Sequence, residues 1–490
     1  MLTKSDFVKF IQCPKYVWLY KHRKDLIPEE IDENLQMIFD EGYHVESFAY
    51  QLFPNGINAQ VEGFNESIVK TKKLMDDKTP IIFQPTISSR DLFCRADIIK
   101  LNKDGESWDI YEVKSSTQVK DINLQDLSFQ KICFASAGYK IGKIHLVYIN
   151  NKYTRHGQIE PKKLLHIKDI TEEVTYLENQ TKAEITQALK TIKQTEMPVT
   201  RILKQCRDPY ECTFLDYCWK DIPDNSIYDI AGGLTETKLN LLLDEGILNI
   251  KDIPDKFVTS KAGKRHHQAV KHDTVHLEPE NIKEELGQLQ YPLYFLDYET
   301  FAPGVPLFDG YRPYQRMTFQ YSLHIQTKPG GPLKHYEYLA KDWKDPSLEL
   351  AADLKKHLGN KGSVIAWNMS FEKGCNSEMG QRYPKFAEFF EDVNDRMFDL
   401  MQVFKKGYYV HKNFHGSASI KQVMPVLVPG LSYDHLEIHE GATASNSWRK
   451  MIDPDKPANE KKEIYQNLLK YCELDTRAMV EILKVLEKIK

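Results

Sequence analysis

Short apolar runs that end at acidic residues predict β-strands that carry carboxylates. The run 291–296 leads directly into Asp297 and Glu299, which stand two residues apart. Because residues i and i+2 of a strand project from one face, both carboxylates are expected to point the same way. A second apolar run, 364–367, predicts another strand, and Glu372 follows it.

An earlier stretch has the pattern of a β-hairpin. Residues 95–100 and 108–114 alternate apolar and polar positions, and the turn between them contains Asp-Gly. Glu112 and Lys114 then share one face of the second strand, and the neighbouring strand can bring Asp97 beside them. Two acids and a lysine are therefore expected at one edge of this sheet.

Helical periodicity is clearest at the end of the chain. Apolar residues recur at helical spacing through 463–488, so Tyr471 and Asp475 fall one turn apart on the same face. Gln130 lies in another segment with a helical pattern.

These patterns predict an α/β protein in three parts. Residues 1–220 alternate helix-like and strand-like segments, residues 221–285 are polar and helical in pattern, and residues 286–490 form a second strand-rich domain. The middle part is expected to be a plain helical linker, with a helix-hairpin-helix-like module as the alternative, since a helix ends at Gly246. A length of 490 residues fits two or three domains.

Composition restricts the class of protein. With 41% hydrophobic and 28% charged residues the chain is typical of a soluble globular protein, and no apolar run approaches the roughly 18 residues of a membrane span. The start of the chain lacks a signal-peptide core, so a cytoplasmic location without membrane partners is expected. A net charge of −4 argues against a basic nucleic-acid coat protein, but not against an enzyme with local basic groups.

Eight cysteines in a reducing compartment favour thiols or metal ligands over disulfides. One group consists of an early cysteine and three later ones with five residues between neighbours: Cys13, Cys206, Cys212 and Cys218. The others lie in apolar contexts and are expected to be core thiols: Cys94, Cys133, Cys375 and Cys472.

The hairpin with its flanking residues resembles the PD-(D/E)xK nucleases, which have a restriction-endonuclease-like fold, and within them the RecB-like branch. The resemblance implies that Asp97 and Glu112 bind metal, that Lys114 is catalytic, and that Gln130 belongs to the Gln-x-x-x-Tyr motif, with phenylalanine in place of its tyrosine. It also implies a metal-binding histidine on an upstream helix, here His44.

The four spaced cysteines resemble those of the iron–sulfur RecB-like nucleases, including the family linked to CRISPR adaptation and the AddB nuclease module. That resemblance implies a [4Fe–4S] cluster held by Cys13, Cys206, Cys212 and Cys218. A Cys₄ zinc site is the alternative, since such tetrahedra are common, and no metal at all is a third.

The C-terminal motifs resemble the DnaQ-like exonucleases of the DEDD tyrosine subtype, which have an RNase H-like fold. The resemblance extends to an uncharacterised domain family often fused behind RecB-like nucleases. It implies that Tyr471 orients water and that four acids bind Mg²⁺ or Mn²⁺: Asp297, Glu299, Glu372 and Asp475. Glu372 stands where the family has an aspartate, and Asp399 is the reserve candidate.

The expected function is that of a metal-dependent DNA nuclease with two catalytic modules, acting on single-stranded or duplex ends through metal-activated water. A DNA-end-binding scaffold with a weak C-terminal site and an RNA exonuclease are the alternatives. A redox enzyme has little support, because no dinucleotide fingerprint accompanies the cysteines. Repair, recombination, phage defence and CRISPR adaptation, with their protein partners, all fit.

Overall fold

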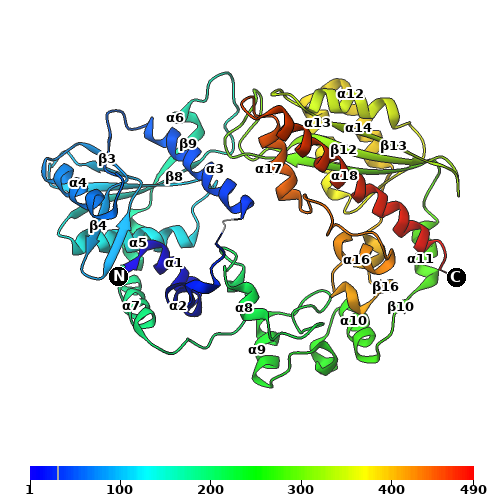
Figure 1. The fold of residues 1–490 in the computed structure, drawn as a ribbon, viewed down its shortest axis with the longest axis horizontal. Helices are drawn as coiled ribbons and strands as arrows, with labels where there is room; N and C mark the ends of the chain where they lie inside the picture. The colour runs from blue at the N-terminus through cyan, green and yellow to red at the C-terminus, as the bar shows by residue number, and fades with distance from the viewer. Residues whose placement is uncertain (30–31, 490) are drawn as a thin grey trace. The chain divides into compact units, whose positions relative to one another are not determined.

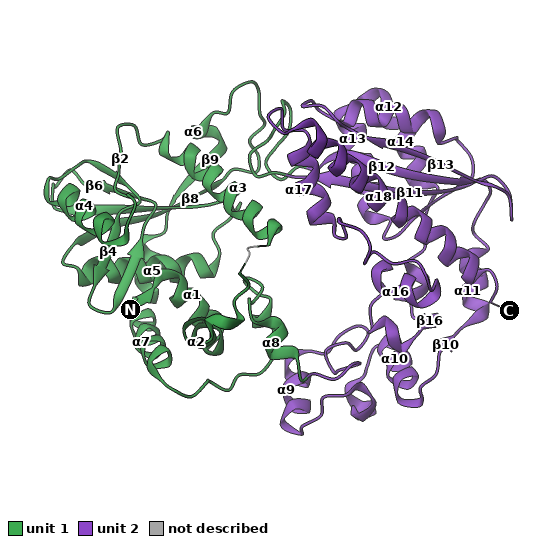
Figure 2. Ribbon diagram, viewed as in Figure 1, with its two compact units in different colours: residues 1–221, 303–315 green, residues 222–302, 316–490 purple. Residues whose placement is uncertain are grey.

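The computed structural model describes residues 1–29 and 32–489. The chain divides into two compact units, one of residues 1–221 with 303–315 and one of residues 222–302 with 316–490 (Figure 2). Each unit contains a β-sheet with helices packed against it (Figure 1). The expected α/β class is therefore confirmed.

The first unit is built on a six-stranded sheet of order β2-β3-β6-β7-β8-β9. Strands β6 and β7 are antiparallel neighbours, whereas β7 and β8 are parallel and joined through helix α5. A smaller sheet has the order β1-β5-β4. The strands are β1 (Leu2–Thr3), β2 (Ile57–Asn58), β3 (Ile81–Phe83), β4 (Thr86–Ser89), β5 (Leu92–Arg95), β6 (Ile98–Leu101), β7 (Ser107–Lys114), β8 (Lys140–Ile149) and β9 (Leu165–Asp169).

Helix α5 explains why the hairpin strands are buried. It packs against α1 and α7 as well as against the sheet, and Leu127, Phe129 and Phe134 on it are fully buried in the core. The helices of this unit are α1 (Lys4–Gln12), α2 (Pro14–His22), α3 (Glu33–Tyr50), α4 (Phe64–Asp76), α5 (Asp121–Ser136), α6 (Pro161–Leu164), α7 (Thr171–Lys193) and α8 (Leu215–Trp219).

The second unit is built on a five-stranded sheet of order β13-β12-β11-β14-β15. The first three strands are antiparallel, and β14 and β15 continue parallel to β11. The strands are β11 (Leu293–Phe301), β12 (Met317–Gln326), β13 (Leu333–Leu339), β14 (Ser363–Ala366) and β15 (Met397–Asp399), with a separate pair β10 (His276–Leu277) and β16 (Tyr409–Val410).

The long helix α18 packs against β11 and β12 and buries one face of these strands. Its apolar side, which includes Leu468, Met479 and Leu483, is buried. The helices of this unit are α9 (Glu236–Asp244), α10 (Lys261–His272), α11 (Pro279–Leu286), α12 (Ser347–His357), α13 (Ser370–Arg382), α14 (Ala387–Asp395), α15 (Gln402–Lys405), α16 (Ile420–Leu427), α17 (Gly441–Met451) and α18 (Ala458–Leu486).

Residues 222–285, expected to form a linker, group with the second unit. Strand β10 pairs with β16, and Arg265 Nη1 donates to the Lys406 carbonyl over 2.7 Å. Backbone pairing and a buried arginine connect this segment to the rest of the second unit, so the segment is an integral part of that unit.

Residues 303–315, between β11 and β12, belong to the first unit instead. Val305 is buried among apolar residues of α3 and β7, and the Tyr311 carbonyl accepts from the Arg155 amide over 3.0 Å. The strand connection of one sheet therefore contributes to the core of the other unit, which strand patterns alone do not predict.

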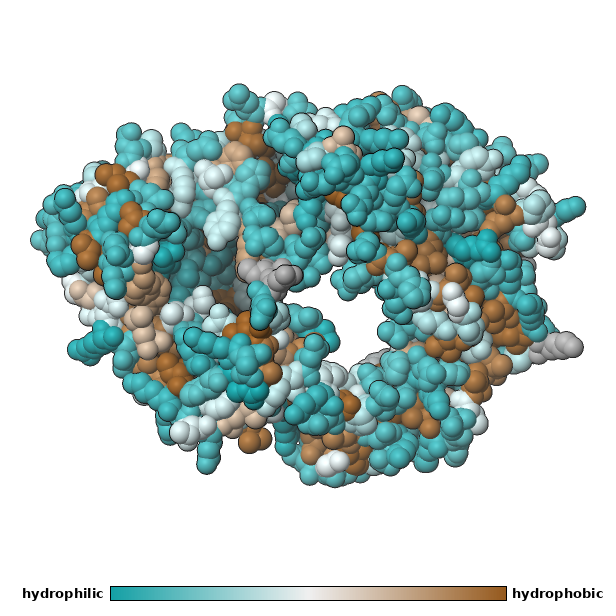
Figure 3. Space-filling model, viewed as in Figure 1, coloured by the Kyte–Doolittle hydropathy of each residue, from teal (hydrophilic) through white to brown (hydrophobic). Residues whose placement is uncertain are grey.

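None of the described helices is long and apolar enough to cross a bilayer. On the face drawn in Figure 3, hydrophilic residues cover most of the surface and hydrophobic ones lie in separate patches.

Gly416 should be essential to the stability of the second unit. It adopts φ +68°, and a Cβ there would lie 1.7 Å from the Asp229 carbonyl oxygen. Gly416→Ala should therefore lower the free energy of unfolding by roughly 3 kcal/mol, from strain and overpacking together. Gly246, at φ +70° with open space around it, is the matched control, so Gly246→Ala should cost only about 1 kcal/mol. Equal losses in denaturant titrations would contradict the close packing at Gly416.

Candidate functional site

Strand β11 and helix α18 bring together the acids of the second unit. Asp297 and Glu299 project from one face of β11, and Asp475 reaches them from α18. One carboxylate oxygen from each lies within 4.8 Å of the others. These three residues, far apart in the sequence, thus form an oxygen-ligand set of the kind that binds Mg²⁺ or Mn²⁺.

Burial and mutual repulsion perturb these acids. Burial, followed by the charges of Asp475 and Glu299, raises the pKa of Asp297 well above its usual value. Burial likewise raises the pKa of Asp475 to about 6, against the opposing hydrogen bond from Tyr433. Negative charge here lacks sufficient compensation from the protein, and a divalent cation would supply it.

Two tyrosines and a lysine complete this site. The Tyr433 hydroxyl donates to Asp475 Oδ1, and its ring centre lies 6.1 Å from that of Tyr471. Lys421 Nζ lies over both rings, 5.7 and 5.9 Å from their centres. Burial, then the nearby carboxylate of Asp475, raises the pKa of Tyr471, so its hydroxyl remains a hydrogen-bond donor at neutral pH.

Glu372 and Asp399 have different environments. Glu372 is 2% exposed, and its Oε2 atom has no hydrogen-bond partner among the described residues. Burial raises the pKa of Glu372 to about 8, and nearby Asp399 and Asp475 contribute. Asp399 instead accepts from the amides of Asn368 and Met401, over 3.0 and 3.2 Å, and therefore shapes the turn after β14. The orphaned oxygen of Glu372 suits a metal ligand better.

In the first unit, Glu112 is the centre of a second buried cluster. Its Oε1 accepts from Lys114 over 2.7 Å and from Lys4 over 2.9 Å, and its Oε2 accepts from Gln130 over 2.9 Å. Burial raises the pKa of Glu112, but Lys114 and Lys4 overcome that effect and hold the pKa below its usual value. The expected Glu112, Lys114 and Gln130 thus lie together.

Asp97 lies beside this cluster and connects it to helix α3. Its Oδ2 accepts from the Val113 amide over 2.7 Å. Burial, then the charge of Glu112, raises the pKa of Asp97 to about 8. Gln84 donates to Glu46 and contacts Asp97 Oδ1 over 3.5 Å, and the Tyr50 hydroxyl also donates to Glu46.

Helix α3 therefore contributes Glu46 to this network, whereas His44 is exposed and packs against Phe48 at 5.2 Å between ring centres. Among the described residues, His44 forms no potential metal-ligand group with Asp97 and Glu112. Two residues along a helix correspond to a rotation of roughly 200°, so His44 and Glu46 face different ways.

Sequence reasoning missed several residues of these sites, among them Glu46, Lys421, Asp126, Lys4 and Tyr433. Lys114 Nζ also binds Asp126 over 3.0 Å, and Asp126 stands four residues before Gln130 on α5. That spacing was a usable signal, because both side chains share a helical face. Lys4 and Tyr433 gave no such signal, since only the tertiary fold brings them to the acids.

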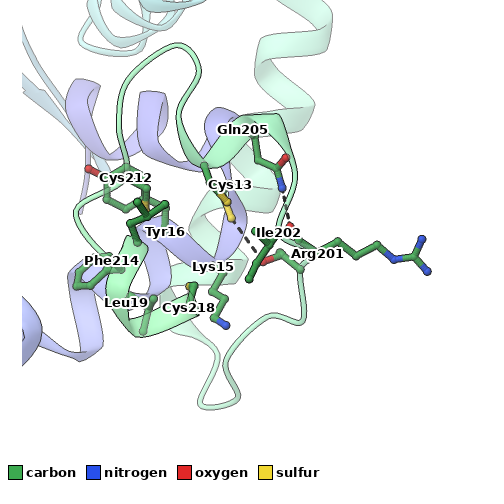
Figure 4. Close-up of a pocket in the computed structure, with 13 residues that line it drawn as sticks. Cys13, Lys15, Tyr16, Leu19, Arg201, Ile202, Gln205, Cys212, Phe214 and Cys218 are labelled. Atoms are coloured by element: carbon green, nitrogen blue, oxygen red, sulfur yellow. Dashed lines mark hydrogen bonds between the residues drawn. The ribbon is translucent and has the colours of Figure 1, made fainter. Parts of the chain in front are cut away.

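The four spaced cysteines line one pocket of the first unit (Figure 4). Cys13 stands between α1 and α2, and Gln12 Nε2 donates to the carbonyls of Gln205 and Tyr210, over 2.8 and 2.6 Å. The amide of Cys212 donates to the Cys206 carbonyl over 2.9 Å. The early and late segments therefore meet in the structure.

The spread of the sulfur atoms bears on the kind of metal. Among the described residues, no three of these thiols have Sγ atoms that all lie within 4.8 Å of one another. A tetrahedral zinc site, with Zn–S bonds of about 2.3 Å, would require closer sulfurs. A cubane, which binds each thiolate through a different iron, allows its sulfur ligands to lie farther apart than a single zinc ion does. Burial raises the pKa of Cys212 to about 12, so the free Cys212 thiol is neutral.

The known proteins that this chain resembles do not indicate an activity. Residues 294–419 match a family described as a domain of unknown function (DUF2779). That range contains Asp297, Glu299 and Glu372 but ends before Tyr471 and Asp475. The chain is also similar to Uncharacterized protein MG366 of Mycoplasma genitalium, with 23% identity over 228 residues. The match covers 42% of this chain and 34% of that protein, so it spans about a third of the relative's length.

Removing a cysteine of this pocket should destabilise the first unit. If the pocket holds the expected iron–sulfur cluster, Cys13→Ser should lower the melting temperature and the iron content of anaerobically purified protein, because that cluster would join the segments around 13 and 206–218. Cys133→Ala, a buried thiol of the same unit outside the pocket, should leave the iron content unchanged. Equal iron in both variants would exclude a cluster at these four residues.

Metal should stabilise the second unit more at higher pH. Since Asp475 and Glu372 have pKa values of about 6 and 8, above their usual values, their contribution to folding is full below about pH 4 and is lost as pH rises to 8. A fixed Mn²⁺ concentration of 100 times the Kd at pH 8 should add about 2.7 kcal/mol at pH 8 and less at pH 5.5, where protons compete for the carboxylates.

Calorimetric scans of the wild type and Asp297→Asn measure this difference. The variant controls for Mn²⁺ bound by the first unit and should show a smaller gain at both pH values. A gain independent of pH, or one that Asp297→Asn retains in full, would contradict a metal site at these acids.

Proposed function

We propose that the protein is a divalent-metal-dependent DNA nuclease with two catalytic modules, one in each unit. The observation that carries the proposal is the convergence of Asp297, Glu299 and Asp475, with ligand oxygens within 4.8 Å. Buried acids of raised pKa are typical of functional sites rather than of stable cores.

The second unit supports an RNase H-like exonuclease of the DnaQ type. Its two-acid strand lies at the centre of a mixed sheet, and α18 supplies the acid and tyrosine of the last motif. Asp297, Glu299 and Asp475 would hold the ions, with Glu372 as a further ligand. Bound divalent metal would supply the Lewis acidity that activates water for attack on a phosphodiester.

Side chains beside the acids would handle the water and the substrate. The protonated Tyr471 hydroxyl can donate a hydrogen bond that orients water, as the tyrosine subtype implies. Lys421, which lies over both tyrosine rings, is placed to offset negative charge on phosphate.

The first unit supports a PD-(D/E)xK nuclease of the RecB-like branch. Asp97 and Glu112 would bind metal, with Glu46 in the position expected for His44. Although burial lowers it, the pKa of Lys114 lies well above its usual value because of Glu112 and Asp126, so the side chain stays cationic. That charge can offset the charge that develops on phosphate, and Gln130 Oε1, which has no hydrogen-bond partner among the described residues, can accept from water.

A [4Fe–4S] cluster at the cysteine pocket would stabilise the fold of the first unit. It would join the start of the chain to the end of the first unit without taking part in hydrolysis. DNA ends, single-stranded or duplex, are the proposed substrate, and repair, defence or CRISPR adaptation would use such an activity.

Two single variants test the two modules. Lys114→Ala should reduce the cleavage of labelled DNA by the first module at least about 100-fold, and Asp297→Asn should do the same for the second, because each removes a charge essential to its site. Single-stranded and duplex DNA and RNA, with Mg²⁺ or Mn²⁺, are the substrates, and the double variant should be inactive.

Exposed residues of the same units provide controls. Lys100→Ala and Asp395→Ala, at exposed positions, should cleave as the wild type does. Wild-type cleavage by both Lys114→Ala and Asp297→Asn would exclude the proposal. DNA binding without cleavage by the wild type would favour the end-binding scaffold, and RNA cleavage alone the RNA exonuclease.

A further inference from the structure

Two histidines and a glutamate form a second cluster on the sheet of the second unit. His324 on β12 pairs directly with His335 on β13, and Glu473 projects from α18. One ligand atom of each lies within 4.8 Å of the others. None of the three belongs to the proposed nuclease site.

A hydroxyl group forms a hydrogen bond with each of the two imidazoles. His324 Nδ1 lies 2.9 Å from Thr476 Oγ1, and His335 Nε2 lies 2.9 Å from Ser322 Oγ. The two hydroxyls lie 2.7 Å apart. This arrangement leaves Nε2 of His324 and Nδ1 of His335 as the ligand atoms, and histidine ligands of metals ordinarily have their other nitrogen fixed in this way.

The two rings lie close together, and His324 has the charge state that a metal requires. They stack at 4.4 Å between centres, with 24° between their planes. His324 is 3% exposed, and burial, followed by the charge of His335, lowers the pKa of His324 to about 3. Its imidazole is therefore neutral at physiological pH, which is the form that binds metal.

Two carboxylates near the cluster favour a cation, although the positive charge of Arg477 acts against one and also lowers the pKa of His324. Glu473 is exposed and lies 3.9 Å from His335 Nδ1. Glu337, two residues beyond His335 on the same face of β13, adds a further negative charge, whereas Arg477 on α18 is paired with Glu481 over 2.6 Å.

We propose that His324, His335 and Glu473 form a third metal site, which takes a nitrogen-preferring divalent ion of the Zn²⁺ class. Two imidazoles and one carboxylate are a common ligand set for zinc, whereas Mg²⁺ prefers oxygen alone. The ion would tie α18 to β12 and β13. Because α18 also carries Asp475 and Tyr471, zinc would hold the register of the helix that completes the nuclease site.

Zinc binding to the full chain tests this site without depending on nuclease activity. The protein, purified with its cysteine pocket loaded and kept in excess Mg²⁺ to occupy the carboxylate sites, is titrated with Zn²⁺ by calorimetry. The wild type should bind one more equivalent than His335→Gln or Glu473→Gln. Thr476→Val, which removes the hydroxyl that contacts His324 Nδ1 and Ser322 Oγ and leaves all three ligands in place, should weaken binding about 10- to 100-fold.

Glu463→Gln, an exposed change on the same helix, is the matched control and should bind as the wild type does. Zinc should raise the melting temperature of the wild type and this control, but not of Glu473→Gln. Circular dichroism establishes that each variant is folded. Wild-type stoichiometry and affinity in folded Glu473→Gln and His335→Gln would overturn the proposal, as would a wild type that takes up no zinc under these conditions.

Discussion

The second unit depends on one costly arrangement, in which acidic side chains from β11 and α18 are buried against each other. Like charges at this separation repel, and burial removes the water that would screen them. This unfavourable free energy arises at Asp297, Glu299 and Asp475. Tyr433 donates one hydrogen bond to the cluster. Such a cluster is destabilising by itself, and a bound divalent cation would compensate its negative charge. The first unit differs, because Lys4 and Lys114 already compensate Glu112.

Local periodicity predicted the residues that share one element. The two-residue spacing of Asp297 and Glu299 placed both on one face of a strand, and the four-residue spacing of Tyr471 and Asp475 placed both on one side of a helix. The hairpin of β6 and β7, with Asp97 beside Glu112, follows from alternation and an Asp-Gly turn. These features depend on bonds within one element or between neighbours in the sequence.

Features that depend on tertiary packing could not be predicted from local sequence patterns. Glu46 joins the first cluster through Gln84, and this link depends on how α3 packs against β7. Residues 222–285 form part of the second unit because β10 pairs with β16, more than a hundred residues later. Residues 303–315 join the first unit through contacts with Arg155 and the core around Val305. No local pattern encodes such partners.

The central claim is that buried acids in the second unit bind divalent metal, and anomalous diffraction from crystals soaked in Mn²⁺ tests it most directly. The account predicts an anomalous peak within bonding distance of carboxylate oxygens of Asp297, Glu299 and Asp475. Crystals in which Mn²⁺ binds elsewhere, while these three carboxylates remain protonated and bonded only to protein groups, would contradict it.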